Sequence, residues 1–95
     1  MKPLPPDVQV YKRTPDFTEA TVPAGLLKSH QTKDGTWGRI QVTAGALLYR
    51  ILEPTVEEHL LTPGKPGIVE PQVLHEVAPQ GTVSFYVEFL QATKK

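Results

Sequence analysis

Proline and glycine set the upper limit on the length of any regular element in this chain. The 95 residues include ten prolines and seven glycines, which recur from Pro3 to Gly81. Proline fixes φ and lacks a backbone donor, so it interrupts helices and central strands. No stretch between these residues shows an apolar repeat at the spacing of a helix. The sequence therefore predicts an all-β protein built from short strands.

The apolar segments that remain are the predicted strands. Between them stand short sequences rich in Gly, Pro and Asp, which are typical of turns. Eight short strands in one chain indicate a sandwich or a barrel. We expect a single domain over 1–95, ordered from about 8 to 90 with loose polar ends. The predicted strands are 8–12, 25–30, 36–43, 46–52, 56–62, 67–70, 73–78 and 82–90.

Balanced charge and the absence of cysteine narrow the possible partners. Ten Lys and Arg face ten Asp and Glu, so no net positive field favours nucleic acid or anionic lipid. The amino-terminal segment has no apolar signal region, and no apolar run approaches the ~20 residues that span a bilayer. We therefore expect a cytoplasmic protein without nucleic acid or membrane partners. Because cysteine is absent, His, Asp and Glu are the candidate metal ligands.

Alternation along the last predicted strand indicates which side chains face the core. Val83, Phe85, Val87 and Phe89 share one parity, and Glu88 has the other. An inward Glu88 would turn three apolar side chains outward, so we exclude it as a metal ligand.

The same alternation predicts the direction of one histidine and leaves another open. His75 shares its parity with Val73 and Val77, so it should point inward. His30 lies at the end of a predicted strand, where inside and outside are weakly specified.

The spacing from Gly64 to His75 resembles the second sequence motif of the cupin superfamily. That motif places a glycine, a proline, a second glycine and a histidine at fixed intervals. Here Glu70 and Gln72 stand in the motif's proline and second glycine positions, and His75 is kept. The first cupin motif is poorer, since only His30 is present and Gly38 stands where a glutamate is expected.

A closer resemblance covers the chain from about Val10 to Leu90. The runs "VYKRTP", "HQTKDGTWGRIQV", "EEHLLTP" and "VEPQVLHEV" resemble the N-terminal cupin-like domain of the TehB tellurite-resistance methyltransferases and, more loosely, the small YeaR-like proteins. This resemblance implies a jelly-roll type antiparallel β-barrel that is usually able to hold a metal. The catalytic half of TehB is absent, and no glycine-rich loop precedes a helix to hold S-adenosylmethionine.

The candidate metal site centres on the two histidines. His75 is either a ligand, which the cupin spacing favours, or a core histidine bonded to a backbone carbonyl. His30 is either a second ligand or an exposed residue at a strand end. Glu70 has three readings: a third ligand, a partner that orients an imidazole, or a turn residue. His59, between charged neighbours, reads as solvated surface, although its place in the "EH" pair keeps it among the candidates.

A ligand pocket is the second candidate site. Arg39 offers a planar fork for a carboxylate or an oxyanion, while aromatic residues in strands are also there to fill a pleated, half-buried surface. The residues assigned to this pocket are Trp37, Arg39, Gln72 and Tyr49, with Tyr86 as a further aromatic candidate.

Three functions follow as hypotheses. The first is a metal-binding cupin that binds or senses a small molecule or an oxyanion such as tellurite in stress response. The second is a metalloenzyme of the dioxygenase or isomerase type, and the third is an accessory module without metal. The divalent ion would be zinc, nickel, iron or manganese, completed by water. Because a small barrel must cover its edge strands, we also expect a homodimer.

Overall fold

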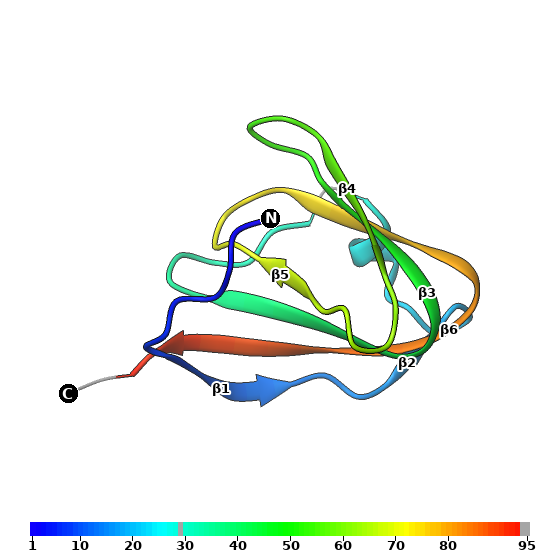
Figure 1. Cartoon of the computed structure of the whole chain (residues 1–95), viewed down its shortest axis with the longest axis horizontal. Coiled ribbons are helices and arrows are strands. Elements are labelled where there is room, and N and C mark those ends of the chain that lie inside the picture. The colour runs from blue at the N-terminus through cyan, green and yellow to red at the C-terminus, as the bar shows by residue number, and fades with distance from the viewer. Residues whose placement is uncertain (29, 94–95) are drawn as a thin grey trace.

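Two long antiparallel strands, β3 (Trp37–Ile51) and β6 (His75–Ala92), form most of the sheet. They are seen in a computed structural model that describes residues 1–28 and 30–93 (Figure 1). The two strands pair along their length, from Trp37 opposite Leu90 to Ile51 opposite His75. The four segments predicted at 36–43, 46–52, 73–78 and 82–90 are therefore halves of two continuous strands.

Each long strand bends near its middle. The β3–β6 register shifts between Val42 and Ala44 and again between Gly45 and Leu47. At this bend Gly45 has a φ of +78° and Gly81 has a φ of +77°, a conformation that glycine adopts without strain. Figure 1 shows β6 turning back across the view between its orange and red parts. The "TAG" sequence is thus a bulged bend inside one strand rather than a turn between two.

Four short strands extend this pair. β1 (Val8–Arg13) and β2 (Phe17–Thr18) pair with β6, and β4 (Glu57–Leu61) and β5 (Gly67–Val69) pair with β3, all antiparallel. The order β1–β6–β3–β4 is open at both ends over the described residues. The all-β expectation is confirmed, but closure into a barrel is not.

The bend divides the sheet into two parts that share one core. The first half-sheet contains β1, β2, β5, the part of β3 before the bend and the part of β6 after it. The second half-sheet contains β4, the part of β3 after the bend and the part of β6 before it. Buried side chains from both halves form a single cluster. Inward positions in β3 change from even numbers, Ile40 and Val42, to odd numbers, Leu47 and Tyr49, because the bulge adds a residue. Within β6, the predicted inward side chains Val83, Phe85 and Val87 are all buried.

The predicted strand at 25–30 is wrong. Residues Ala24–Leu27 form η1, a 3-10 helix that starts after Pro23 and packs against β6. Among the described residues of this segment, only His30 makes a β-bridge, and its partner is His75. Ser29, within this predicted strand, and Lys94 and Lys95, in the predicted carboxy-terminal tail, lie outside the described residues.

The strands run from Val8 to Ala92, and the single domain with ordered limits at about 8 and 90 stays a prediction. Across residues 1–28 and 30–93, no helix has the length and apolar character needed to cross a bilayer. The cytoplasmic location stays a prediction.

Candidate functional site

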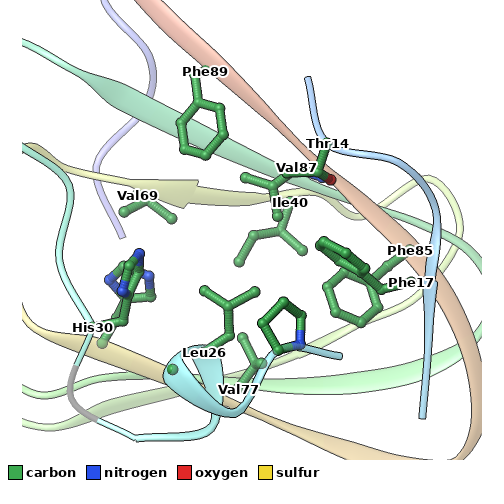
Figure 2. Close-up of a pocket in the computed structure, with 13 residues that line it drawn as sticks. Thr14, Phe17, Leu26, His30, Ile40, Val69, Val77, Phe85, Val87 and Phe89 are labelled. Atoms are coloured by element: carbon green, nitrogen blue, oxygen red, sulfur yellow. The ribbon is translucent and has the colours of Figure 1, made fainter. Parts of the chain in front are cut away.

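An apolar pocket lies between the segment from β2 to η1 and the inner face of the sheet (Figure 2). Its volume is about 250 Å³. The first half-sheet supplies the largest share of the lining, and η1 covers one side. The lining residues are Thr14, Phe17, Pro23, Gly25, Leu26, His30, Ile40, Val69, His75, Val77, Phe85, Val87 and Phe89.

Aromatic rings and η1 form the pocket's cover. Phe17, placed in β2 opposite Phe85, packs against that ring edge to face, with ring centroids 5.7 Å apart. Figure 2 shows Phe89 and the Phe17–Phe85 pair on different sides of the cavity, with Leu26 of η1 below. Such edge-to-face packing is favourable for aromatic rings. The cover therefore consists of β2 and η1, which make few sheet hydrogen bonds, and the apolar inner face of the sheet forms the floor of the pocket.

Two histidines meet at the polar edge of this pocket. The amide of His30 donates to the carbonyl of His75 at 2.7 Å, and the amide of His75 donates back at 2.8 Å. Their rings are nearly perpendicular, with centroids 5.4 Å apart. The sequence prediction that these two residues are neighbours in the site therefore matches their placement. The inward direction predicted for His75 is also confirmed, since its exposed fraction is 3%.

Burial controls the protonation of His75. Desolvation lowers the pKa of its imidazole, and the nearby His30 lowers the pKa further, against an opposing hydrogen bond to Val73. Nδ1 lies 3.2 Å from the Val73 carbonyl oxygen. A carbonyl only accepts, so Nδ1 carries the proton in the neutral ring. Nε2 is therefore the unprotonated nitrogen.

The other polar group in the lining is already engaged. The Thr14 hydroxyl accepts from the Val87 amide at 3.0 Å and donates to the Pro15 carbonyl at 2.9 Å. Thr14 thereby ties the segment after β1 to β6. Its hydroxyl has little capacity left for a ligand.

Tyr49 joins the two half-sheets through the core. Its ring is 1% exposed, and its hydroxyl donates to the Ile68 carbonyl of β5 at 2.8 Å. Burial raises the pKa of Tyr49 well above its usual range, so the hydroxyl stays protonated. The ring also contacts His75 edge to face, at 5.8 Å between centroids. Tyr49, predicted in a ligand pocket, does not line the apolar pocket but borders a separate cavity.

Glu70 and His59 lie away from the apolar pocket. Glu70 borders a separate polar cavity of about 280 Å³ and forms an ion pair with Lys2 at 3.3 Å. Glu57, in the same cavity, accepts from the Met1 ammonium at 2.6 Å and lies 3.1 Å from His59 Nε2. Neither Glu70 nor His59, the further ligands predicted from the sequence, therefore joins His30 and His75.

The remaining pocket candidates lie on other surfaces. Arg39 pairs with Glu88 at 2.7 Å, and this contact lowers the pKa of the Glu88 carboxyl. Trp37 shares the parity of Arg39 in β3 and is half-buried. Gln72 is exposed, with a φ of +62°. None of these three residues lines the apolar pocket.

Sequence reasoning missed most of the residues that line the pocket. Phe17, Leu26 and Phe89 come from β2, η1 and β6, which are far apart in the sequence. The parity of Phe89 was a usable signal. No local pattern marks Phe17 or Leu26, because they meet only through tertiary folding.

Comparison with known proteins places this arrangement in context. A family model described as "TehB-like domain" matches residues 12–87. Two curated relatives, from Haemophilus influenzae strains Rd and 10810, are each 38% identical over 71 residues and are named "Probable S-adenosyl-L-methionine-dependent methyltransferase TehB". The match covers 70% of this chain and 25% of each relative, so it spans about a quarter of their length.

Solved structures support the same fold. The crystal structure of TehB from H. influenzae has a TM-score of 0.84 and 29% identity, over 92% of this chain and 32% of that one. A structure of a protein from Escherichia coli K12 has a TM-score of 0.86 at 23% identity, over 99% of this chain and all of that one. At that identity the second likeness shows the fold alone.

Two predictions are wrong in the light of these findings. The metal-binding cupin function and its divalent cofactor (zinc, nickel, iron or manganese) are overturned, because the curated relatives are named as S-adenosylmethionine-dependent methyltransferases. The donor set agrees: within residues 1–28 and 30–93, no three His, Asp or Glu residues group as metal ligands require. The physical reason is that Glu70 pairs with Lys2 while His75 Nδ1 is held by a backbone carbonyl.

Proposed function

Because this chain belongs to the family of TehB-like domains, we propose that it takes part in S-adenosylmethionine-dependent methyl transfer as the domain that binds the methyl acceptor. The curated relatives carry the methyltransferase name on chains about four times as long as the matched segment. In this proposal the methyl donor is held by a separate unit, on the same polypeptide or on a second protein.

The described residues do not fit S-adenosylmethionine itself. That cofactor carries a carboxylate, an ammonium and a sulfonium, and burying such charges without partners is costly. The apolar pocket has no Asp, Glu, Lys or Arg in its described lining. The helix η1 has only four residues and follows a proline, so it does not provide the glycine-rich helix start that binds such cofactors in α/β folds.

The apolar pocket is the observation that carries the proposal. Apart from Phe89, its lining residues fall within the family match, and beside Thr14 and the two imidazoles the lining side chains are aliphatic or aromatic. Small-molecule sites are concave, mostly apolar and furnished with a few polar groups. An oxyanion gains nothing from this lining, since no cationic side chain faces it. The pocket therefore favours a neutral, mostly apolar acceptor.

A segment exchange tests the proposal. In H. influenzae TehB, the matched segment would be replaced by that of this chain, and S-adenosylhomocysteine release measured over a panel of small neutral compounds. We expect acceptor preference to follow the exchanged segment. Leu26→Trp, which fills the pocket, should raise the acceptor KM roughly tenfold or more, a loss of at least about 1.4 kcal/mol.

Leu27→Trp is the matched control, because Leu27 is the neighbouring η1 residue and is 42% exposed. It should leave the acceptor KM unchanged. Acceptor preference that ignores the exchange, or a Leu26→Trp enzyme with normal KM, contradicts the proposal. Titration of S-adenosylmethionine into this chain alone should give no binding.

The finer resemblances remain proposals. We infer kinship with the cupin superfamily from the spacing of Gly64 and His75, and from the φ of +62° at Gln72, where the cupin motif has glycine. Kinship with the YeaR-like proteins is inferred from the runs that also resemble TehB, such as "VEPQVLHEV". We also propose a homodimer that covers the open edge of β4, where Val56 and Leu60 are 63% and 55% exposed.

A further inference from the structure

The apolar pocket leaves one kind of polar contact available to a ligand. Of its three polar lining side chains, Thr14 is already engaged by Val87 and Pro15. His30 and His75 remain. A side-chain hydrogen bond that orients a ligand here therefore involves an imidazole.

His75 offers that ligand an acceptor rather than a donor. Its Nδ1 proton is directed to the Val73 carbonyl oxygen, which leaves Nε2 with a lone pair. No hydrogen bond to Nε2 occurs among the described residues. In the same part of the chain, no fully buried side-chain nitrogen or oxygen lacks a partner, so Nε2 is reached from the cavity or from solvent.

The shape and charge of the cavity narrow the ligand further. Its volume is about 250 Å³, and the partly exposed rings of Phe17 and Phe89 border it, with the fully buried Phe85 behind Phe17. A cavity of about 150 Å³ in another protein holds benzene, so a single substituted ring fits here. The described lining carries no acidic side chain and no Lys or Arg, which favours an uncharged molecule.

We propose that the pocket binds a neutral, single-ring aromatic alcohol, whose hydroxyl donates a hydrogen bond to Nε2 of His75 while its ring packs against Phe17 and Phe89. This inference rests on the proposed function in treating the pocket as the acceptor site. It adds the class of the acceptor and the atom that recognises it.

Ligand pairs test the hydroxyl without changing the protein. Phenol and toluene have nearly the same shape, and anisole is phenol with its donor removed by methylation. Calorimetric or NMR titration of the purified chain should show phenol binding about 3- to 10-fold more tightly than toluene or anisole, the value of one net hydrogen bond. The 15N resonance of His75 Nε2 should shift with phenol and not with toluene.

His75→Phe removes the acceptor and keeps a ring of similar size. It should abolish the preference for phenol and leave toluene binding intact. Leu26→Trp should block all three compounds, and Leu27→Trp none. Because these readouts compare ligands on one folded variant, a general loss of stability does not imitate them.

The outcomes separate the two proposals. If toluene and phenol bind equally well to the wild-type protein, or if His75→Phe keeps the preference for phenol, the aromatic-alcohol inference is overturned and the acceptor pocket stands. If none of the three compounds binds and Leu26→Trp changes nothing, the inference and the proposed acceptor pocket both fail.

Discussion

His75 combines a strand position, a core position and a place in the candidate site. Its backbone bridges His30, while its ring contacts both His30 and Tyr49. The ring is neutral because burial opposes charge. The sequence leaves two readings of His75, a metal ligand or a core histidine bonded to a backbone carbonyl. Its hydrogen bond to the Val73 carbonyl corresponds to the second reading.

The lowered pKa of His75 makes stability depend on pH. The unfolded state takes up a proton near the ordinary histidine pKa of about 6.5, whereas the folded state resists it. Stability is therefore fully present above about 6.5 and declines as the pH falls below it, with a slope of at most about 1.4 kcal/mol per pH unit. Chemical denaturation between pH 7.5 and 5.5 measures this decline.

His75→Phe should flatten that decline, since it removes the titrating group. Val77→Ala, which is buried beside it and carries no charge, should lower stability by a constant amount across the same range. Titration of Glu88 does not contribute to the decline in this range, because its lowered pKa affects stability only in more acidic solution. An unchanged slope in His75→Phe would contradict this account.

Gln72 stores a small amount of backbone strain. Its φ of +62° disfavours any side chain, at a cost of about 1–2 kcal/mol. Glycine removes that cost but loses more chain entropy on folding. We expect Gln72→Gly to raise the free energy of unfolding by about 0.5–1 kcal/mol in urea denaturation. Gln91→Gly, at an exposed strand position, should lower it; a loss in both variants would refute the strain.

At the scale of elements, alternation was informative where one face is buried along a regular strand. Val83, Phe85 and Val87 were assigned inward correctly because period two holds there. The same reasoning failed at 25–30, where Leu26 packs into the pocket from a 3-10 turn. It also failed at 43–46, where a turn was predicted and a bulge is found. Turns and bulges both use glycine for positive φ, so the sequence does not distinguish them.

The candidate site was predictable only in part for the same reason. Strand parity and the cupin spacing pointed to His75, and the family resemblance added His30 as its neighbour in the site. The cover formed by Phe17 and Leu26 depends on how β2 and η1 fold over the sheet, which no local pattern records. The outward pairing of Arg39 with Glu88 follows from the β3–β6 register, which a single sequence does not specify.

The bend itself can be tested through its glycines. A Cβ at Gly45 would lie 2.0 Å from the Thr82 carbonyl oxygen, whereas a Cβ at Gly81 meets nothing within 4 Å. Both residues have positive φ. Gly45→Ala should therefore lower the free energy of unfolding by about 3 kcal/mol or more, and Gly81→Ala by only about 1–2 kcal/mol. Equal losses in urea denaturation would show that the close approach at Gly45 is unimportant.

For the whole molecule, the open edges of the sheet determine how it associates. Within residues 1–28 and 30–93, β4 pairs only with β3, and it carries the exposed Leu60. Unpaired edges are templates for pairing with another chain. We expect sedimentation at high micromolar concentration to give twice the 10.5 kDa mass of the chain. Leu60→Lys should return the monomer.

Val10→Lys is the control for this association. Val10 is 41% exposed on β1, at the opposite end of the strand order, so the change should leave the dimer intact. A single species of 10.5 kDa for the wild-type protein would rule out the homodimer. If Val10→Lys, rather than Leu60→Lys, separates the chains, the interface lies on β1.

The continuity of β3 and β6 through both half-sheets has a kinetic consequence. Neither half can open alone, because each contains part of the same two strands. Amide protons in the paired parts of β3 and β6 should therefore exchange with solvent only when the whole molecule unfolds. The segment from β2 to η1 is held by far fewer hydrogen bonds and can open locally. A ligand would then reach the buried imidazole by brief detachment of this segment, at a rate that hydrogen exchange of its amides would report.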